Sequence, residues 1–447
     1  MRYLVLGLGR QGKGIVQFLL ENNEMVYGHD KDEEKVKEFI KYKNFCPLKE
    51  EEIIKMKNVK NLLVIVSAGI NNENPILQSL ANFCEVISDI EFVYHYIKDK
   101  TIIAITGTNG KSTTTCLIGE ILLKDNKEVF YGGNLAPGKP AIEAVREKKE
   151  FNVLEISSFQ LARIKNFKPY IGVLINISYD HLDWHKNFEE YFKAKMRIFE
   201  NQTEKDYCVI NKILIDHPYF ETPKSIIYIF STYDKKANAY YDEVKEEFYI
   251  NFGNLTKKIL NAQELQLIGK CYQENILAAI LVSKILAVKE EVLLAGLKNF
   301  KGLPHRLELV MEKGGISYIN NSMCTNPTAG IKSLLAFEKE VILITGGKEK
   351  NLPLEDYVRT ISEKAKYVIL FGENKEKLKE KLLAIGYKNF SLAESLKEAV
   401  IKAKEVSQKG DIILFSPAFA SFDYFQDFME RGEKFKEVVY EIEKSEV

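Results

Sequence analysis

The side chains best suited to chemistry lie in one short glycine-rich segment. It reads Thr106-Gly107-Thr108-Asn109-Gly110-Lys111-Ser112-Thr113, between an apolar run at 101–105 and a helical pattern that extends through Leu123. Such a loop binds phosphate because glycines expose backbone N–H groups, a lysine neutralises charge and a hydroxyl reaches a bound magnesium ion. Its glycines are closer together than in the general P-loop pattern. The order of strand, loop and helix still predicts a site for nucleotide phosphates.

A second glycine turn lies near the amino terminus. Gly7-Leu8-Gly9-Arg10-Gln11-Gly12 follows a strand expected at 3–6 and opens a helix, and Asp30 stands at the end of the next strand. This arrangement brings backbone N–H groups to a phosphate and is typical of dinucleotide sites, so a nicotinamide dehydrogenase is one hypothesis. The alternative is that these glycines only permit tight packing of strand against helix.

Three further segments carry polar side chains, and each also has a simpler explanation. Leu154-Glu155-Ile156-Ser157-Ser158-Phe159-Gln160-Leu161 offers a carboxylate and two hydroxyls, but it also reads as a helix cap. Asn176-Ile177-Ser178-Tyr179-Asp180-His181-Leu182-Asp183 offers groups that ligate metal or contact a substrate, although such side chains are common on surfaces. Tyr191-Phe192-Lys193-Ala194-Lys195-Met196-Arg197-Ile198 reads equally as a solvated basic helix face.

The elements that position these segments follow an α/β pattern. The chain has 447 residues, and because one domain averages roughly 150 residues we expect several packed units. Short β-branched runs alternate with longer stretches of helical spacing, which indicates parallel α/β units. We expect three domains, at 1–96, 97–300 and 301–447. Their predicted strands include 3–6, 25–28 and 62–66, then 101–106 and a strand-rich stretch at 225–252, and finally 316–319, 341–345, 367–371 and 412–415.

Composition excludes several classes of protein. Lys plus Arg and Asp plus Glu are both 63, which leaves no net charge and disfavours a nucleic-acid partner. The 46% hydrophobic content is that of a folded globule. Six cysteines lack CxxC spacing, so we expect no disulfide framework and a reducing compartment. The first residues read as a strand rather than a signal peptide, and no apolar run reaches the roughly 18 residues of a membrane helix. We therefore expect a cytoplasmic protein without membrane insertion.

The order of these segments resembles the Mur ligase family. The resemblance covers essentially the whole chain, because the phosphate loop, the segments at Glu155, Asn176 and Lys195, and two later motifs follow in the family's order. The later motifs are Pro304-His305-Arg306-Leu307-Glu308 and Ser416-Pro417-Ala418-Phe419-Ala420-Ser421-Phe422-Asp423. Within the family, the sequence looks most like the members that add D-glutamate to UDP-N-acetylmuramoyl-L-alanine. The motifs that carry this resemblance are Ser157-Ser158-Phe159-Gln160-Leu161, Ser416 to Asp423 and Phe428-Met429-Glu430-Arg431-Gly432-Glu433-Lys434-Phe435.

The resemblance implies a fold and an activity. The fold is α/β, with a Rossmann-like first domain that holds the UDP substrate, a central P-loop-type ATPase domain with a parallel sheet, and a Rossmann-like third domain that holds the amino acid. The activity is that of an ATP- and Mg²⁺-dependent amide ligase of peptidoglycan precursor synthesis, which works through an acyl phosphate and acts as a monomer. Lys195 matches a family lysine that is carbamylated with carbon dioxide.

The resemblance also assigns site residues. Lys111, Glu155, His181 and Lys195 are the expected catalytic residues, and Ser112, Glu155, His181 and carbamylated Lys195 the expected metal site. The expected ATP contacts are Gly107, Thr108, Asn109, Gly110, Lys111, Ser112, Thr113, Asn275, Arg306 and Asn321. The expected UDP-substrate contacts are Gly9, Arg10, Gln11, Asp30, Ser67, Gly69 and Asn134. The expected amino-acid contacts are Thr325, Lys350, Ser421, Phe422 and Phe428.

The sequence departs from the family at positions that concern the acceptor and the nucleotide. A motif that usually reads Asn-Asp-Ser-Lys-Ala-Thr-Asn is here Asn320-Asn321-Ser322-Met323-Cys324-Thr325-Asn326. Asn321 can hydrogen-bond a ribose hydroxyl but lacks the stronger charged acceptor, and Met323 removes a cation. One explanation is drift within a D-glutamate ligase. The others are a ligase for a different amino acid or carboxylate, such as a pseudomurein-type precursor, and a catalytically silent protein that binds a UDP-sugar nucleotide.

Overall fold

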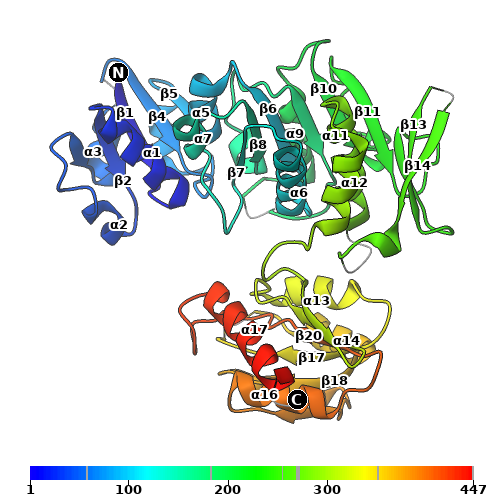
Figure 1. Cartoon of the computed structure of the whole chain (residues 1–447). Coiled ribbons are helices and arrows are strands. Elements are labelled where there is room, and N and C mark those ends of the chain that lie inside the picture. Colours follow the sequence, from blue (N-terminus) through cyan, green and yellow to red (C-terminus); the bar gives the residue numbers. More distant parts are fainter. Residues whose placement is uncertain (57–58, 182–183, 254, 268–271, 350–351, 445–447) are drawn as a thin grey trace. The chain divides into compact units, whose positions relative to one another are not determined.

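The computed structural model describes residues 1–56, 59–181, 184–253, 255–267, 272–349 and 352–444. Within these ranges the chain forms two compact units. The first comprises residues 1–264 and 273–298 and contains two sheets, and the second comprises 265–272 and 299–447 and contains one. Figure 1 shows α-helices beside each of the three sheets. The α/β fold predicted from the sequence is confirmed, whereas the boundary drawn at 96 and 97 stays a prediction.

The first sheet is parallel, with strand order β3-β2-β1-β4-β5. Along β1, Val5 packs into one hydrophobic cluster while Leu4 and Leu6 pack into another, because successive side chains point to opposite faces. Its strands are β1 (Arg2–Leu6), β2 (Met25–His29), β3 (Phe45–Pro47), β4 (Leu62–Val66) and β5 (Glu85–Ser88). Its helices are α1 (Arg10–Glu21), α2 (Glu33–Lys37), α3 (Glu50–Lys55), α4 (Pro75–Leu80) and α5 (Asp89–Ile97).

The second sheet has the order β14-β13-β12-β11-β10-β9-β6-β8-β7. The strands from β7 to β12 pair in parallel, and β13 and β14 extend the sheet as an antiparallel hairpin. Its strands are β6 (Thr101–Thr106), β7 (Val129–Gly133), β8 (Phe151–Glu155), β9 (Ile171–Leu174), β10 (Tyr207–Asn211), β11 (Ile226–Ser231), β12 (Ala239–Asp242), β13 (Glu247–Phe252) and β14 (Leu255–Asn261). Its helices are α6 (Lys111–Lys124), α7 (Glu143–Glu147), α8 (Ser158–Leu161), α9 (Phe188–Met196), η2 (Arg197–Phe199), α10 (Lys212–Ile215), η3 (Ala262–Glu264), α11 (Gln273–Ile285) and α12 (Glu290–Asn299).

The third sheet has the order β15-β16-β20-β17-β18-β19, and only β15 is antiparallel to its neighbour. All five residues of β17 are buried, with Leu343 in one cluster and Ile342 and Ile344 in the other, as expected of a parallel strand covered on both faces. Its strands are β15 (Glu308–Lys313), β16 (Ile316–Asn320), β17 (Val341–Thr345), β18 (Ala365–Leu370), β19 (Phe390–Leu392) and β20 (Ile412–Phe415). Its helices are α13 (Pro327–Leu335), α14 (Glu355–Lys364), α15 (Lys375–Ala384), α16 (Leu396–Glu405) and α17 (Phe428–Lys444).

The state of the cysteines and the character of the helices can be given for the described residues. The five cysteines within them are all free thiols, three of them buried and two partly exposed. No described helix has both the length and the apolar character required to cross a bilayer.

Candidate active site

The phosphate loop lies between β6 and α6, as the sequence predicted. Gly110, which precedes α6, has φ of 80°, and a Cβ there would lie 2.7 Å from Nδ2 of Asn275. The Asn275 amide donates to the Gly110 carbonyl at 2.9 Å and is 1% exposed. A side chain at position 110 would therefore meet both a strained backbone and a steric clash. Asn275, predicted to contact ATP, holds the loop with its amide nitrogen in this structure.

Two lysines meet at one carbonyl of this loop. Lys111 Nζ donates to the carbonyls of Gly107 and Thr108, both at 3.0 Å, and Lys195 Nζ donates to the same Gly107 carbonyl at 2.7 Å. Lys195 is 1% exposed, and its Nζ lies 4.8 Å from the centre of the Tyr191 ring. Burial, followed by the nearby charge of Lys111, lowers the pKa of Lys195 well below its usual value. The interpretation of Lys195 as part of a solvated basic face is wrong.

Glu155 contributes a buried carboxylate at the end of β8. Its Oε1 accepts from Asn134 Nδ2 at 3.3 Å, while its Oε2 is buried and has no hydrogen-bond partner among the described residues. Burying a carboxylate oxygen without a partner is costly unless a cation or a donor pairs with it. Ser112, also predicted to bind metal, is buried at the start of α6. The Glu155 carboxylate therefore fits the position of a metal ligand.

His181 stands at the edge of the same region. Its backbone has φ of 54°, and its ring lies 4.8 Å from the Phe159 ring and 6.1 Å from the Tyr191 ring, measured between centroids. The Tyr191 hydroxyl hydrogen-bonds Thr108 Oγ1 at 3.0 Å, which connects this aromatic group to the phosphate loop. Among the described residues, no three His, Cys, Asp or Glu side chains are grouped closely enough to hold a metal ion. A cation beside Glu155 would therefore need other ligands as well, such as the Ser112 hydroxyl, water or bound phosphates.

Sequence reasoning missed a carboxylate that supports the loop. Glu274 Oε2 accepts from Asn176 Nδ2 at 2.6 Å and Glu274 Oε1 from Asn211 Nδ2 at 2.8 Å, and burial raises the pKa of Glu274. Asn176 Oδ1 in turn accepts from the backbone N–H of Asn109 at 2.9 Å. Glu274 therefore orients the amide that holds the phosphate loop. Its only sequence signal is its place beside Asn275, because Asn176 lies 98 residues away along the chain.

The amino-terminal glycine turn has the close packing that its glycines permit. Gly7 has φ of 85°, and a Cβ on Gly12 would lie 2.0 Å from the Gly7 carbonyl oxygen. Asp30 holds this turn, since its Oδ2 accepts from the Leu8 N–H at 2.6 Å and its Oδ1 from the Asp32 N–H at 2.9 Å. Gly9 has open space where a Cβ would stand. The turn is thus tightly built by Asp30, and Gly9 leaves room for a ligand at the start of α1.

Arg10 and Gln11, which were predicted to contact the UDP substrate, hydrogen-bond the segment at 133–141. The Arg10 guanidinium donates to the carbonyls of Leu135, Gly138 and Gly133, the last two at 2.9 and 3.2 Å. Gln11 Nε2 donates to the Gly133 carbonyl at 2.5 Å and its Oε1 accepts from Ala141 N–H at 3.0 Å. This segment carries Asn134, which contacts Glu155. Both side chains therefore position the Asn134 segment.

We expect the Arg10→Ala variant to weaken the use of the UDP substrate. Losing three charge-assisted hydrogen bonds frees the segment that carries Asn134, so KM for that substrate should rise about tenfold while KM for ATP stays within about twofold. Steady-state kinetics with each substrate varied in turn measures this. Lys13→Ala is the matched control, because Lys13 lies on the same helix and pairs with exposed Glu38 at 2.6 Å. Equal increases in KM for the UDP substrate and for ATP would contradict this role of Arg10.

A further cation and an open cavity lie near the remaining UDP-substrate residues. Arg163 is 8% exposed; its Nη2 donates to the Ile70 carbonyl at 2.6 Å and its Nη1 has no partner among the described residues. It thereby supports the loop that follows β4, where Ser67 and Gly69 lie, and a Cβ on Gly69 would meet open space. A cavity of about 630 Å³ opens beside Asp30, lined also by Lys31, Val36, Ile40 and Leu48 among others. Its mixed apolar and polar lining suits a nucleoside.

The described residues among the predicted amino-acid contacts follow two strands: Thr325 follows β16, and Ser421, Phe422 and Phe428 follow β20. The Cys324 carbonyl, next to Thr325, accepts from the Ala418 N–H at 3.0 Å. The Ala420 carbonyl, next to Ser421, accepts from the Lys348 N–H at 2.9 Å. Ser421 is buried, Phe422 is 67% exposed, and Phe428 begins α17. Lys350 lies outside the described residues. Loops beyond the carboxyl ends of parallel strands form ligand sites in open α/β sheets.

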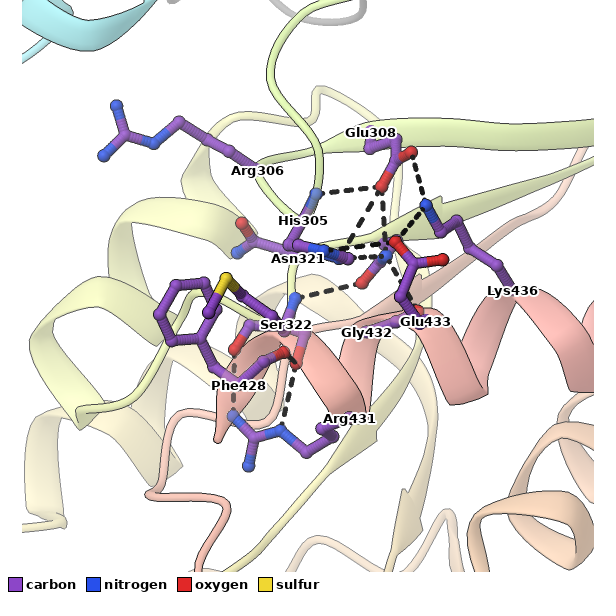
Figure 2. A network of polar contacts seen from close by, with 12 residues as sticks. His305, Arg306, Glu308, Asn321, Ser322, Phe428, Arg431, Gly432, Glu433 and Lys436 are labelled. Atoms are coloured by element: carbon purple, nitrogen blue, oxygen red, sulfur yellow. Dashed lines mark hydrogen bonds and ion pairs between the residues drawn. The ribbon is translucent and has the colours of Figure 1, made fainter. Parts of the chain in front are cut away.

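Arg306 and Asn321 differ in what they offer a ligand. In Figure 2 the Arg306 guanidinium extends away from the surrounding polar network. Asn321 is 6% exposed, and its amide hydrogen-bonds Leu307, Ser333 and Ser416 within the same unit. Arg306 therefore presents a charge outward, whereas the Asn321 side chain is engaged by its neighbours.

Comparison with known sequences identifies relatives over the full length. The family described as "Mur ligase middle domain" matches residues 105–283, and that described as "Mur ligase, glutamate ligase domain" matches residues 305–419. The UDP-N-acetylmuramoylalanine–D-glutamate ligase of Caldicellulosiruptor bescii is 40% identical over 98% of this chain and 97% of its own. The enzyme of the same name from Aquifex aeolicus is 37% identical over 98% of each chain.

Solved structures share the fold. The MurF ligase of Thermotoga maritima in complex with ADP matches with a TM-score of 0.58 and 16% identity, covering 100% of this chain and 95% of its own. The pseudomurein peptide ligase type C of Methanothermus fervidus matches with a TM-score of 0.55 and 19% identity, covering 99% of each chain. At these identities the likeness concerns the fold alone.

Proposed function

Because this chain belongs to the Mur ligase family, we propose that it joins D-glutamate to UDP-N-acetylmuramoyl-L-alanine in peptidoglycan precursor synthesis, with conversion of ATP to ADP and phosphate. The observation that carries this proposal is the similarity to D-glutamate ligases at 37–40% identity along essentially the whole chain. Lys111 and Lys195 both donate to the Gly107 carbonyl of the phosphate loop, and this placement supports the phosphoryl-transfer chemistry that such a ligase requires.

The first chemical step must bring two anions together. The substrate carboxylate attacks the γ-phosphorus of ATP, the bond to the bridging oxygen breaks, and ADP leaves with that oxygen to give an acyl phosphate. Lys111 and the backbone N–H groups of the phosphate loop neutralise the charge that builds on the phosphate oxygens. Asn275 and Glu274 keep this loop in shape through Gly110 and Asn176. The amine of D-glutamate then attacks the acyl carbon, phosphate leaves, the amine loses a proton and an amide remains.

Glu155, Ser112, His181 and a modified Lys195 are the residues we assign to magnesium. The unpaired Oε2 of Glu155 supports this assignment, because a buried carboxylate oxygen needs a cation or a donor. Bound magnesium would neutralise and orient phosphate oxygens. We infer further that Lys195 is carbamylated. The depressed pKa favours its neutral amine, which adds to carbon dioxide with loss of one proton and gives an anionic carbamate.

The substrates divide between the two ends of the chain. We assign UDP to the turn at Gly9, the cavity beside Asp30 and the loop at Ser67 and Gly69, with Asn134 near the end that reacts. We assign D-glutamate to the loops that carry Thr325, Ser421, Phe422 and Phe428. We propose that the enzyme acts as a cytoplasmic monomer, since its substrates are intracellular nucleotides.

Amino-acid-dependent phosphate release tests this proposal. Purified protein with ATP, Mg²⁺ and UDP-N-acetylmuramoyl-L-alanine should release phosphate when D-glutamate is added, and a panel of other D- and L-amino acids should give less than about a hundredth of that rate, because polar groups built for one acceptor stay unpaired with another. Release with another amino acid but not with D-glutamate would favour the alternative ligase. No release with any amino acid, together with UDP-substrate binding, would favour the silent binding protein.

A further inference from the structure

The turn that carries Arg306 has an unfavourable backbone conformation. His305 and Leu307, the residues on either side of Arg306, have φ of 64° and 46°. Residues with a Cβ disfavour this left-handed region and stay in it only when their surroundings fix them. The direction in which Arg306 points therefore depends on the contacts of its two neighbours.

On the His305 side, β15, β16 and α17 supply the contacts (Figure 2). The His305 N–H donates to Glu308 Oε2 at 2.8 Å, and Asn320 Nδ2 lies 3.0 Å from His305 Nδ1. Burial lowers the pKa of His305, which agrees with a neutral ring that accepts at Nδ1. A Cβ on Gly432 would lie 2.1 Å from His305 Nδ1, so only glycine lets α17 pack on the ring. His305 is thus fixed from three elements.

On the Leu307 side, the contact comes from Asn321. Its Oδ1 accepts from the Leu307 N–H at 3.2 Å, and its Nδ2 donates to Ser333 Oγ at 2.6 Å and to Ser416 Oγ at 3.1 Å. Both of its donor hydrogens are therefore engaged inside the unit, and its oxygen accepts one hydrogen bond there. Because Asn321 is 6% exposed, little of this side chain is accessible to a ligand.

The partner of the amide also explains why an amide is suited to this position. Ser333 Oγ donates its one hydrogen to the Ala329 carbonyl at 2.7 Å, so toward residue 321 it can only accept. The amide of Asn321 supplies the donor that Ser333 lacks. A carboxylate would place a second acceptor against this oxygen.

We propose that Asn321 is a positioning residue that clamps the Leu307 N–H and thereby sets the direction in which Arg306 reaches the nucleotide, without touching the ribose itself. This inference rests on the proposed ATP-dependent function. It replaces the expectation that Asn321 is a weakened ribose ligand. The residue contributes to nucleotide use only through Arg306.

One double-mutant cycle and one comparison of nucleotides test this inference. For the cycle, KM for ATP is measured for wild type, Asn321→Ala, Arg306→Ala and the double variant. For the comparison, KM of wild type and of each single variant is measured for ATP, 2′-deoxy-ATP and 3′-deoxy-ATP. We expect Asn321→Ala to raise KM for ATP about tenfold and the double variant to be within about twofold of Arg306→Ala, because both changes remove one function. The ratio of KM for each deoxy nucleotide to KM for ATP should be the same in wild type and Asn321→Ala. Two results would overturn the inference. One is a double variant whose KM for ATP rises by the product of the two single effects. The other is a ratio of deoxy-nucleotide KM to ATP KM that falls to one in Asn321→Ala.

Two further variants separate positioning from loss of folding. Ser333→Ala removes a partner of the amide but keeps the Leu307 clamp, so it should lower Tm while KM for ATP changes less than about twofold. Asn321→Leu removes the acceptor for Leu307 but fills a similar volume, and it repeats the cycle with Arg306→Ala if Asn321→Ala does not fold. Calorimetric dissociation constants for ATP give the same couplings without turnover. If wild type binds ATP but shows no reaction with D-glutamate, the proposed function fails while those constants still decide the role of Asn321.

Discussion

We expect the Lys111→Met variant to lose about three orders of magnitude in turnover while it still binds the UDP substrate. Lys111 is the cation that the phosphate loop places at its own carbonyls, with Nζ 3.0 Å from the oxygens of Gly107 and Thr108. Removing a positioned charge that stabilises a transferring phosphoryl group costs roughly a thousandfold in rate, or about 4 kcal/mol. Methionine keeps the length and the apolar stem of the side chain, so the change removes mainly the charge.

The readouts for Lys111→Met are single-turnover phosphate release and the dissociation constant of UDP-N-acetylmuramoyl-L-alanine. The dissociation constant should change less than about threefold, because the residues assigned to UDP lie in the loops that follow β1, β2 and β4. Lys124→Met is the matched control, since Lys124 is an exposed residue at the other end of α6. Turnover that survives in Lys111→Met within tenfold of wild type would mean that the phosphate loop is not the site of the chemistry.

The sequence predicted the local elements of this site because they depend on neighbours along the chain. The apolar run before Gly107 and the helical pattern after Lys111 predicted β6 and α6, and the structure confirms both. The order of glycines and hydroxyls in a short loop is likewise a local property. Segments of this kind are fixed by periodicity and turn chemistry, which a single sequence displays.

Contacts between distant segments could not be predicted in the same way. Asn275 reaches Gly110 across 165 residues and Arg10 reaches Leu135 across 125. The sequence marked both side chains as ligand contacts, yet tertiary packing engages them with backbone carbonyls. Nothing local indicates which carbonyl an amide or a guanidinium will meet, because that depends on how the sheets pack.

The turn around Arg306 is a second case in which local rules fail. Positive φ is uncommon for any residue with a Cβ and disfavoured for leucine, so the sequence does not indicate that both residues flanking Arg306 are left-handed. That conformation is imposed by Asn320, Asn321 and Glu308. From the sequence alone Asn321 is a nucleotide contact with a weaker acceptor than aspartate, because nothing local reveals its serine partners at 333 and 416.

The second large effect is expected at Lys195. A lysine that is 1% exposed, donates to the Gly107 carbonyl at 2.7 Å and lies close to Lys111 is poorly suited to carry its own positive charge. A carbamate would convert this repulsion into an attraction and give the loop an anionic neighbour. We expect Lys195→Ala to lower turnover by two to three orders of magnitude, since it removes a group that orients the cation and phosphates.

Rescue distinguishes a carbamate from a simple lysine. Acetate or formate, which supply a carboxylate of similar shape, should restore part of the activity of Lys195→Ala, whereas methylamine should not. Lys195→Arg should stay inactive in both, because a guanidinium fills the space and keeps a positive charge. Rescue by the amine and not by the carboxylates would mean that Lys195 works as a cation.

A direct measurement completes the argument for Lys195. Protein kept in ¹³C-labelled bicarbonate should show one carbamate carbon resonance that is absent from Lys195→Ala, and turnover should fall when carbon dioxide is removed. The resonance should weaken as pH falls, because protonation of the amine competes with its addition to carbon dioxide; the lowered pKa of Lys195 keeps the amine neutral to a lower pH than in an exposed lysine. Lys193→Ala is the control on the same helix, since Lys193 is exposed and pairs with Glu189 at 2.7 Å, and it should keep both the resonance and the activity.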